Sequence, residues 1–258
     1  MNRRNFLRKS AGLLIGSFFG LNCFSKAFAG ETHQHHTVGE PRMALIIDDI
    51  GYSPSNTRQF LNLGVPITFA ILPQLAYSYE LALEIHDHGH EILLHQPMEP
   101  YNVNSFDPGP GALYVGDGPD RIKRIIEENI ADVPYAAGVN NHMGSRFTEA
   151  YEEIRETLKF VKENGLFFVD SLTSSHSKAY RTAKRLHMAA TGRNIFLDNI
   201  HDESAIYYQL NKLKRHSIKY GQAVGIGHPF PETVHSISRY IKNKKNSNIS
   251  WVHVSDVL

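Results

Sequence analysis

The chain of 258 residues contains a single cysteine, Cys23. A disulfide within the chain is therefore excluded, and because Cys23 lies in an N-terminal segment that we expect to be removed, the remainder lacks a thiol nucleophile. The sequence also lacks an excess of either charge, since 27 basic and 26 acidic residues leave a formal net charge of +1. This balance gives no electrostatic footprint for nucleic acid or an acidic membrane surface. Stability must come from a hydrophobic core, for which roughly 230 residues suffice.

Long uncharged apolar runs are absent except near the N-terminus. There, an Arg3-Arg4 pair precedes the run, and a small-x-small cleavage pattern ends at Ala29. This anatomy predicts a signal peptide over residues 1–29, because the run is too short and wrongly flanked for a transmembrane anchor. An uncleaved N-terminal anchor is the alternative. The arginine pair resembles the twin-arginine type, which implies the twin-arginine export machinery as a partner, a periplasmic or extracellular location and no membrane span after cleavage. Residues 30–41 are predicted to form a polar linker.

Residues 42–258 alternate short apolar runs with longer amphipathic stretches and are predicted to form one domain. The predicted strands are 43–48, 67–72, 91–95, 136–141, 166–170, 187–191, 223–227 and 251–254. The predicted helices are 78–88, 120–130, 149–164, 204–220 and 231–242. Such alternation favours parallel strands with crossover helices, and strands covered on both faces explain the continuous apolar runs. We predict an α/β fold, a complete or slightly irregular (β/α) barrel of seven or eight mostly parallel strands; an open doubly wound sheet is the alternative.

Four of the predicted strands end on a carboxylate or an imidazole. These strand ends carry Asp48-Asp49, His95, His142 and His228. In a barrel of parallel strands all C-terminal ends lie on one face, so residues far apart in sequence converge there. Carboxylates and imidazoles are the usual ligands of zinc and similar ions. The pattern therefore predicts a metal-dependent enzyme.

The Asp48-Asp49 pair follows the most apolar of the predicted strands. Two carboxylates this close repel each other when both are ionised, and a nearby cation would relieve that repulsion and keep one of them available as a base. Adjacent strand residues point in opposite directions, so one carboxylate can bind a metal while its neighbour serves another purpose. The alternative is a solvated turn with a helix cap, although Ser53 or Ser55 could supply that cap instead.

The connection from Gln96 to Pro119 is long and rich in proline and glycine, and it contains the aromatic residues Tyr101, Phe106 and Tyr114. Loops of this length in compact domains are usually functional or disordered. Because this loop leaves the predicted catalytic face, we interpret it as a substrate-binding wall rather than a floppy insertion.

The order of three motifs resembles that of the NodB-type polysaccharide deacetylases. These motifs are the strand ending in Asp-Asp, the segment 89–95 and the late strand ending in Gly-x-His. The sequence segments 95–100, 141–145 and 196–199 are similar to those of the divergent polysaccharide deacetylase subfamily in particular. The resemblance extends over residues 41–258. The resemblance implies a general base at Asp48, a metal ligand at Asp49 and a general acid at His228. It also implies that His95 is a metal ligand.

The chain departs from the broader family in its second metal motif, His-x-x-x-His, whose second position is Glu99. Glu99 could coordinate the metal through oxygen or could have left the metal's coordination shell. Since His142 closes the next predicted strand, it is our candidate for the missing imidazole, with a histidine tucked between strands as the alternative. Asp49, His95 and His142 would form a three-ligand site with open positions, as a catalytic zinc requires; mixed Asp/His sites also accept other divalent metals.

Further residues are expected around this site. Asp170 is expected to orient His228 or to bind substrate, and Tyr101, Arg193 and Asp198 are candidate substrate-binding residues. The resemblance implies a metal-dependent hydrolase that removes N-acetyl, or else O-acetyl, groups from an envelope polysaccharide or oligosaccharide. A catalytically degenerate glycan- or cell-wall-binding relative is the alternative, followed by another metallohydrolase acting on a phosphoester or an amide.

Overall fold

The computed structural model describes residues 40–246 and 248–258, and all structural statements concern these residues. The signal peptide predicted over 1–29 and nearly all of the predicted linker therefore lie outside the described residues. Among the helices that the structure describes, none is long and apolar enough to cross a membrane.

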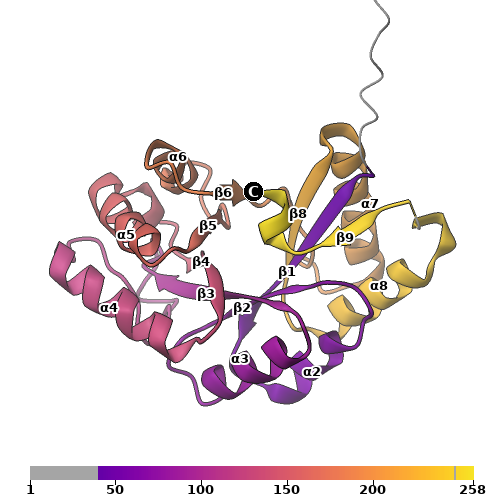
Figure 1. The fold of residues 1–258 in the computed structure, drawn as a ribbon, viewed down its shortest axis with the longest axis horizontal. Helices are drawn as coiled ribbons and strands as arrows, with labels where there is room; N and C mark the ends of the chain where they lie inside the picture. The colour runs from indigo at the N-terminus through magenta and orange to yellow at the C-terminus, as the bar shows by residue number, and fades with distance from the viewer. Residues whose placement is uncertain (1–39, 247) are drawn as a thin grey trace, which may run out of the picture. The chain divides into compact units, whose positions relative to one another are not determined.

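A nine-stranded parallel sheet forms the centre of the fold (Figure 1). Its strands are β1 (Arg42–Ile50), β2 (Thr68–Ile71), β3 (Glu91–Met98), β4 (Ala136–Met143), β5 (Phe167–Asp170), β6 (Ala190–Gly192), β7 (Ile195–Phe196), β8 (Gln222–Gly227) and β9 (Ser250–Val252). The hydrogen-bonded order is β6-β5-β4-β3-β2-β1-β8-β7, and β9 pairs with the beginning of β1. Every strand pairing is parallel, so the C-terminal strand ends share one face.

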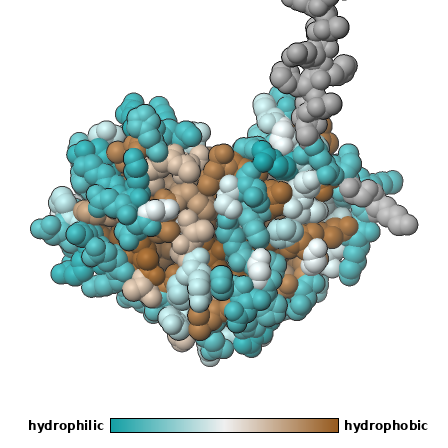
Figure 2. Space-filling model, viewed as in Figure 1, coloured by the Kyte–Doolittle hydropathy of each residue, from teal (hydrophilic) through white to brown (hydrophobic). Residues whose placement is uncertain are grey.

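The helices lie on the outside of the curved sheet (Figure 1). They are α2 (Pro54–Leu61), α3 (Ser78–Asp87), α4 (Pro119–Asp132), α5 (Tyr151–Glu163), α6 (Ala179–Arg185), α7 (Glu203–Tyr220) and α8 (Pro231–Lys242), with short 3₁₀ turns at Phe147–Glu149, Lys244–Asn246 and Val254–Val257. Figure 2 shows hydrophilic residues over the outer helices and hydrophobic residues between them. The outward faces are therefore solvated, while the inward faces bury the sheet.

The predicted α/β barrel is confirmed in its irregular form, because β6 and β7 are the two ends of the strand order and do not pair with each other. The chain itself crosses between these edges. The amide of Arg193 donates to the carbonyl of Asp170 on β5, and the amide of Asn194 donates to the carbonyl of Val224 on β8. Two consecutive residues thus join the two edges of an incomplete barrel.

Three elements were absent from the sequence prediction: α2, α6 and β7. Each is short, with eight, seven and two residues respectively, so hydrophobic periodicity has few positions to register. Helix α2 begins with Pro54 after the N-cap Ser53, whose hydroxyl accepts from the amide of Asn56 at 3.4 Å. Ser53, one of the two serines that the sequence offered as a cap, therefore caps this helix in place of the aspartate pair. The role of Asp48 and Asp49 stays a prediction.

Glycine at position 225 permits a close approach between β8 and α7. A Cβ at Gly225 would lie 2.7 Å from Cδ2 of Leu213, a buried core residue. We therefore expect Gly225→Ala to lower the free energy of unfolding by about 1–3 kcal/mol, the usual cost of overpacking a core. Urea denaturation would measure this loss. In the double variant with Leu213→Ala the clash is absent, so the two losses should be less than additive; strict additivity would contradict this account.

Candidate metal centre

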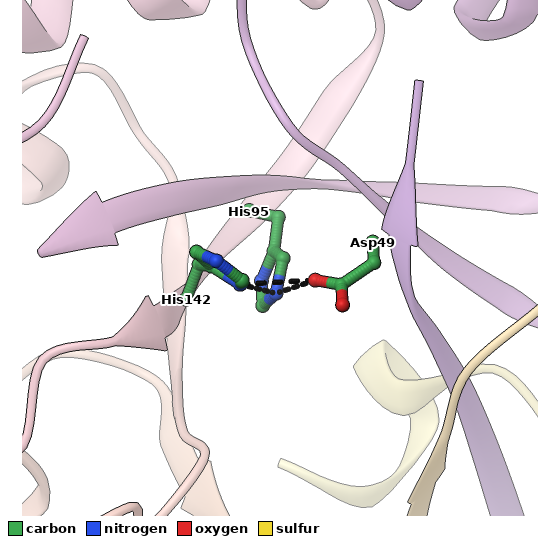
Figure 3. A group of neighbouring side chains, drawn as sticks. All are labelled: Asp49, His95 and His142. Carbon is green, nitrogen blue, oxygen red and sulfur yellow. Dashed lines mark hydrogen bonds and ion pairs between the residues drawn. The ribbon is translucent and has the colours of Figure 1, made fainter. Parts of the chain in front are cut away.

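Three side chains from three different strands meet at the C-terminal face of the sheet: Asp49 from β1, His95 from β3 and His142 from β4 (Figure 3). Oδ1 of Asp49 lies 2.9 Å from Nδ1 of His142 and 3.2 Å from Nε2 of His95. The two imidazole nitrogens are 3.2 Å apart. Three potential ligand atoms thus converge on one point, as a metal site requires.

The backbone at the end of β1 explains how two neighbouring carboxylates reach the same place. Asp49 has a positive φ of 59°, a backbone region that most non-glycine residues avoid and that aspartate and asparagine enter more readily. The pairing of β1 with β2 is irregular at this point, between Ile47 and Ile50. Because the strand bends here, Oδ2 of Asp48 lies 3.6 Å from Nε2 of His95, and Oδ1 of Asp49 lies 3.2 Å from the same nitrogen. The strain is localised at the candidate ligand, where strained backbone often marks function.

The cluster fits a divalent cation such as zinc. Oδ1 of Asp49 is buried and has no hydrogen bond of acceptable geometry, although two imidazole nitrogens face it. Burial favours the neutral form of Asp49, but the imidazoles of His142 and His95 outweigh burial and hold the pKa of this carboxyl below its ordinary range. One carboxylate oxygen and two imidazole nitrogens are a common donor set for zinc. The three predicted ligands are therefore together, and their role as ligands stays a prediction.

Asp48 is buried beside this cluster and is not part of it. Burial raises the pKa of the Asp48 carboxyl above its usual value, against the lowering effect of His95, His228 and the Asn140 amide. A carboxylate with a raised pKa next to a metal site is suited to accept a proton.

One amide side chain connects the predicted base to a predicted ligand. Asn140 on β4 is fully buried; its Nδ2 donates to Oδ1 of Asp48 at 2.8 Å, and its Oδ1 lies 2.8 Å from Nδ1 of His95. An amide oxygen only accepts hydrogen bonds, so the proton of neutral His95 belongs on Nδ1, which leaves Nε2 free to face the metal. The sequence analysis did not single out Asn140 as a functional residue.

Replacing Asn140 with leucine should therefore weaken metal binding and stability together. Oδ1 of Asp48 and Nδ1 of His95 would lose their buried partner, which costs about 1–3 kcal/mol of stability, and metal affinity should fall by about 10–100-fold. Competition with a chelator and urea denaturation measure the two losses. Asn141→Leu is the matched control, because the Asn141 amide contacts Met143, Ser171 and Thr173 and not His95. Equal losses of metal affinity in both variants would contradict the role of Asn140.

His228 directly follows β8 and faces the second carboxylate oxygen of Asp49, whereas His142 faces the first. Its Nε2 is 3.8 Å from Oδ2 of Asp49, and its Nδ1 is 2.9 Å from Oδ1 of Asp198. Oδ2 of Asp198 also accepts from the His228 amide and from the hydroxyl of Thr233. Burial lowers the pKa of His228, but the hydrogen bond and the charge of Asp198 raise it to about 9. A histidine whose pKa is raised by a neighbouring carboxylate is suited to donate a proton.

The expectation that Asp170 orients His228 is wrong, because Asp198 occupies that position. Oδ1 of Asp170 accepts from the amide of Leu172, and Oδ2 accepts from the hydroxyl of Ser177 and the amide of Tyr180. Both oxygens therefore hold the loop between β5 and α6. Asp198, predicted as a substrate-binding residue, has both carboxylate oxygens engaged by His228 and Thr233.

Glu99, the alternative metal ligand, points to a different set of partners. Its Oε1 accepts from Arg146 at 2.6 Å and its Oε2 from the amide of Val115 at 2.8 Å. The carboxylate therefore fastens the long loop that follows β3, and Glu99 is absent from the cluster formed by Asp49, His95 and His142.

Two further predicted substrate-binding residues, Tyr101 and Arg193, contact other residues of the chain. The hydroxyl of Tyr101 donates to Glu149 at 2.7 Å, and the ring is 58% exposed. Arg193 donates to the carbonyls of Ser171 and Leu172, and its guanidinium lies over the ring of Phe196. Arg193 is thus occupied in holding the β5–α6 loop, whereas Tyr101 presents an exposed aromatic surface.

A parallel α/β half-barrel with an Asp/His/His cluster at its C-terminal face places the protein in a defined structural class. The chain belongs to the divergent polysaccharide deacetylase family, whose match spans residues 45–258. It is 34% identical over 232 residues to the uncharacterized protein YibQ of Escherichia coli (strain K12), a match that covers 90% of this chain and 72% of that protein.

Solved structures show the same fold. An uncharacterized protein from Agrobacterium tumefaciens C58 superposes with a TM-score of 0.81 at 25% identity, covering 85% of this chain and 89% of that one. A family 4 carbohydrate esterase from Streptomyces lividans, in complex with acetate, superposes with a TM-score of 0.53 at 14% identity, covering 83% and 93%. The NodB-like barrel expected from the sequence is therefore the observed architecture, and the family is the one that the sequence motifs indicated.

Proposed function

We propose that this protein is a metal-dependent hydrolase that removes acetyl groups, N-linked or else O-linked, from an envelope polysaccharide or oligosaccharide. The observation that carries the proposal is the arrangement of one carboxylate and one imidazole around a potential metal site. Asp48 and His228 lie on β1 and after β8, and both are within 3.8 Å of a member of the Asp49–His95–His142 cluster. The predicted export signal supports an envelope substrate.

The residues divide the work as follows. Asp49, His95 and His142 would hold the metal, which supplies Lewis-acid polarisation of the acetyl carbonyl and a lowered pKa for water. Asp48 takes the proton from the attacking water, and Asn140 keeps its carboxylate in place. His228 gives a proton to the departing amine, and Asp198 holds the imidazole so that Nε2 faces the reacting bond. The products are acetate and the deacetylated sugar.

Membership of the family and the fold shared with a carbohydrate esterase support this chemistry. A further similar structure, with a TM-score of 0.51 at 9% identity, is the catalytic domain of a peptidoglycan N-acetylglucosamine deacetylase from Eubacterium rectale. That likeness recommends peptidoglycan fragments and N-acetylglucosamine oligomers as first substrates.

Acetate release tests the proposal. The purified protein, stripped with a chelator and then reloaded with zinc or with cobalt, should release acetate from at least one acetylated glycan, and the stripped protein should not. Mass spectrometry of the glycan should show the loss of one acetyl group for each acetate. Stoichiometric metal and tight glycan binding without acetate release would instead favour the catalytically degenerate glycan-binding relative.

A further inference from the structure

Helix α6 and the loop before it line a surface cavity of about 510 Å³. Its lining is rich in cationic and hydroxyl side chains, among them Ser175, His176, Lys178, Arg181 and Arg185. We refer to it as the α6 cavity.

The three fully charged cations of the α6 cavity have no acidic partner. Within the described part of the chain, no carboxylate oxygen lies within 4.0 Å of the charged nitrogens of Lys178, Arg181 or Arg185. All three residues are exposed. By contrast, Arg58 and Arg146 each contact a glutamate at 2.8 Å or less. The cavity therefore has a concentrated positive potential.

The acidic side chains around the cavity are already occupied. On the adjoining helix α5, Glu152 and Glu156 both contact Arg155. Glu149 accepts from the hydroxyls of Tyr101 and Ser174, and its closest approach to His176 is 4.0 Å. The single charge of Glu149 offsets only part of the charge of Lys178, Arg181 and Arg185, so the cavity keeps an excess of positive charge and should attract an anion.

The loop that borders the cavity begins at the metal centre. Ser171 accepts from the amide of Asn140 and donates its own backbone amide to Asn141. His176, five residues further on, lines the cavity. Five residues extend over at most about 18 Å, so the two places lie within the reach of a ligand of several sugar units.

From this juxtaposition we propose that the α6 cavity binds an anionic substituent, a carboxylate or a phosphate, of the same glycan chain whose acetyl group lies at the metal centre. The inference rests on the proposed function and adds a substrate class, an acidic glycan rather than a neutral one. Two arginines suit this purpose because each planar guanidinium can donate two parallel hydrogen bonds to a carboxylate or phosphate. The hydroxyl of Ser175 offers a further donor.

Binding measurements test the proposal without any need for turnover. A hexamer of galacturonic acid, a neutral maltohexaose and inorganic pyrophosphate are titrated calorimetrically against the purified chain at low salt. Variants Arg181→Glu and Arg185→Glu reverse charges that line the cavity. Lys184→Glu is the matched control, because Lys184 is an exposed cation of the same helix that does not line the cavity. All three substitutions alter net charge equally.

We expect the uronate hexamer to bind at least about tenfold more weakly to both arginine variants than to the wild type and the control, and to weaken with salt. Maltohexaose binding should not change among the four proteins. If pyrophosphate competes with the hexamer, phosphate substituents belong to the ligand class; if it does not, the cavity is specific for carboxylates. An equal loss in the Lys184 control, or a DNA oligonucleotide that binds as tightly as the hexamer, would overturn the proposal in favour of unspecific polyanion attraction.

The two proposals fail in different ways. One outcome is that no glycan releases acetate, while the arginine variants still bind the hexamer more weakly. This result would support the cavity proposal and contradict the proposed hydrolase activity. If acetate is released but these variants have unaltered KM for acidic acetylated oligosaccharides, the hydrolase stands and the cavity assignment is wrong.

Discussion

Replacing Asp48 with asparagine should lower kcat by about 10²–10⁴-fold, the range that general base catalysis contributes, and leave metal content unchanged. The asparagine is isosteric, and its Oδ1 can still accept from Nδ2 of Asn140, as the aspartate does at 2.8 Å. It cannot take a proton from water. Because Asp48 does not belong to the Asp49–His95–His142 cluster, the ligand set remains complete. Steady-state kinetics and elemental analysis of the same preparation measure both quantities.

Asp49→Asn is the matched control for this experiment, since it makes the same chemical change one residue later. It should lose metal, because the amide replaces the negatively charged oxygen that faces His95 and His142. Asparagine also tolerates the left-handed backbone of position 49, so the fold should be retained. If Asp48→Asn loses the metal and Asp49→Asn keeps it, the two aspartates have the opposite roles.

His142→Ala should reduce metal affinity by more than about 100-fold. Loss of a residue that hydrogen-bonds to a metal ligand already costs about 10–100-fold in metal affinity, and loss of the ligand itself should cost more. Nδ1 of His142 is 2.9 Å from Asp49 and 3.2 Å from Nε2 of His95, so its removal leaves two of the three converging atoms. Elemental analysis after dialysis against a weak chelator should find about one metal ion per wild-type chain and almost none in the variant. Activity should disappear with the metal.

Two further variants make this result specific. His176→Ala removes an imidazole with an 81% exposed side chain that lies outside the cluster, and it should retain the metal. Glu99→Gln tests the alternative ligand; since Glu99 contacts Arg146 and Val115, this variant should also keep its metal and lose some stability of the loop after β3. Metal loss in Glu99→Gln with retention in His142→Ala would reassign the third ligand to Glu99.

The sequence predicted the parts of the site that depend on strand ends. Apolar runs locate the parallel strands, and the common face of parallel strands then brings Asp49, His95 and His142 together without any knowledge of side-chain geometry. All eight predicted strands occur in the structure. The one strand that was not predicted, β7, has only two residues. The same reasoning placed His228 near them, since the chain reaches it directly after β8.

The hydrogen-bond partners of these site residues, which come from other strands of the sheet, could not be predicted in this way. Asp170 and Asp198 both end or follow apolar runs, and the choice between them as the partner of His228 depends on which strand lies beside β8. That neighbour is β7, whose residues Ile195 and Phe196 give no recognisable strand pattern. Asn140 escaped notice as a functional residue for a related reason: an amide in a polar strand end has no distinguishing spacing, and only its contacts with Asp48 and His95 reveal its position.

The incomplete closure of the barrel has a mechanical consequence. Between β6 and β7 the circumference is completed by the covalent chain at Arg193 and Asn194, by one backbone hydrogen bond from each, and by their side chains, which bond to Ser171, Leu172 and Val224. Because no pair of strands is hydrogen-bonded across this gap, we expect the barrel to deform most easily here. The part that carries β8, Asp198 and His228 would then shift relative to the part that carries β4 and β5. Amide hydrogen exchange should be fastest along this joint, and a disulfide engineered across it should slow the approach of His228 to the metal ligands while leaving the ligands themselves in place.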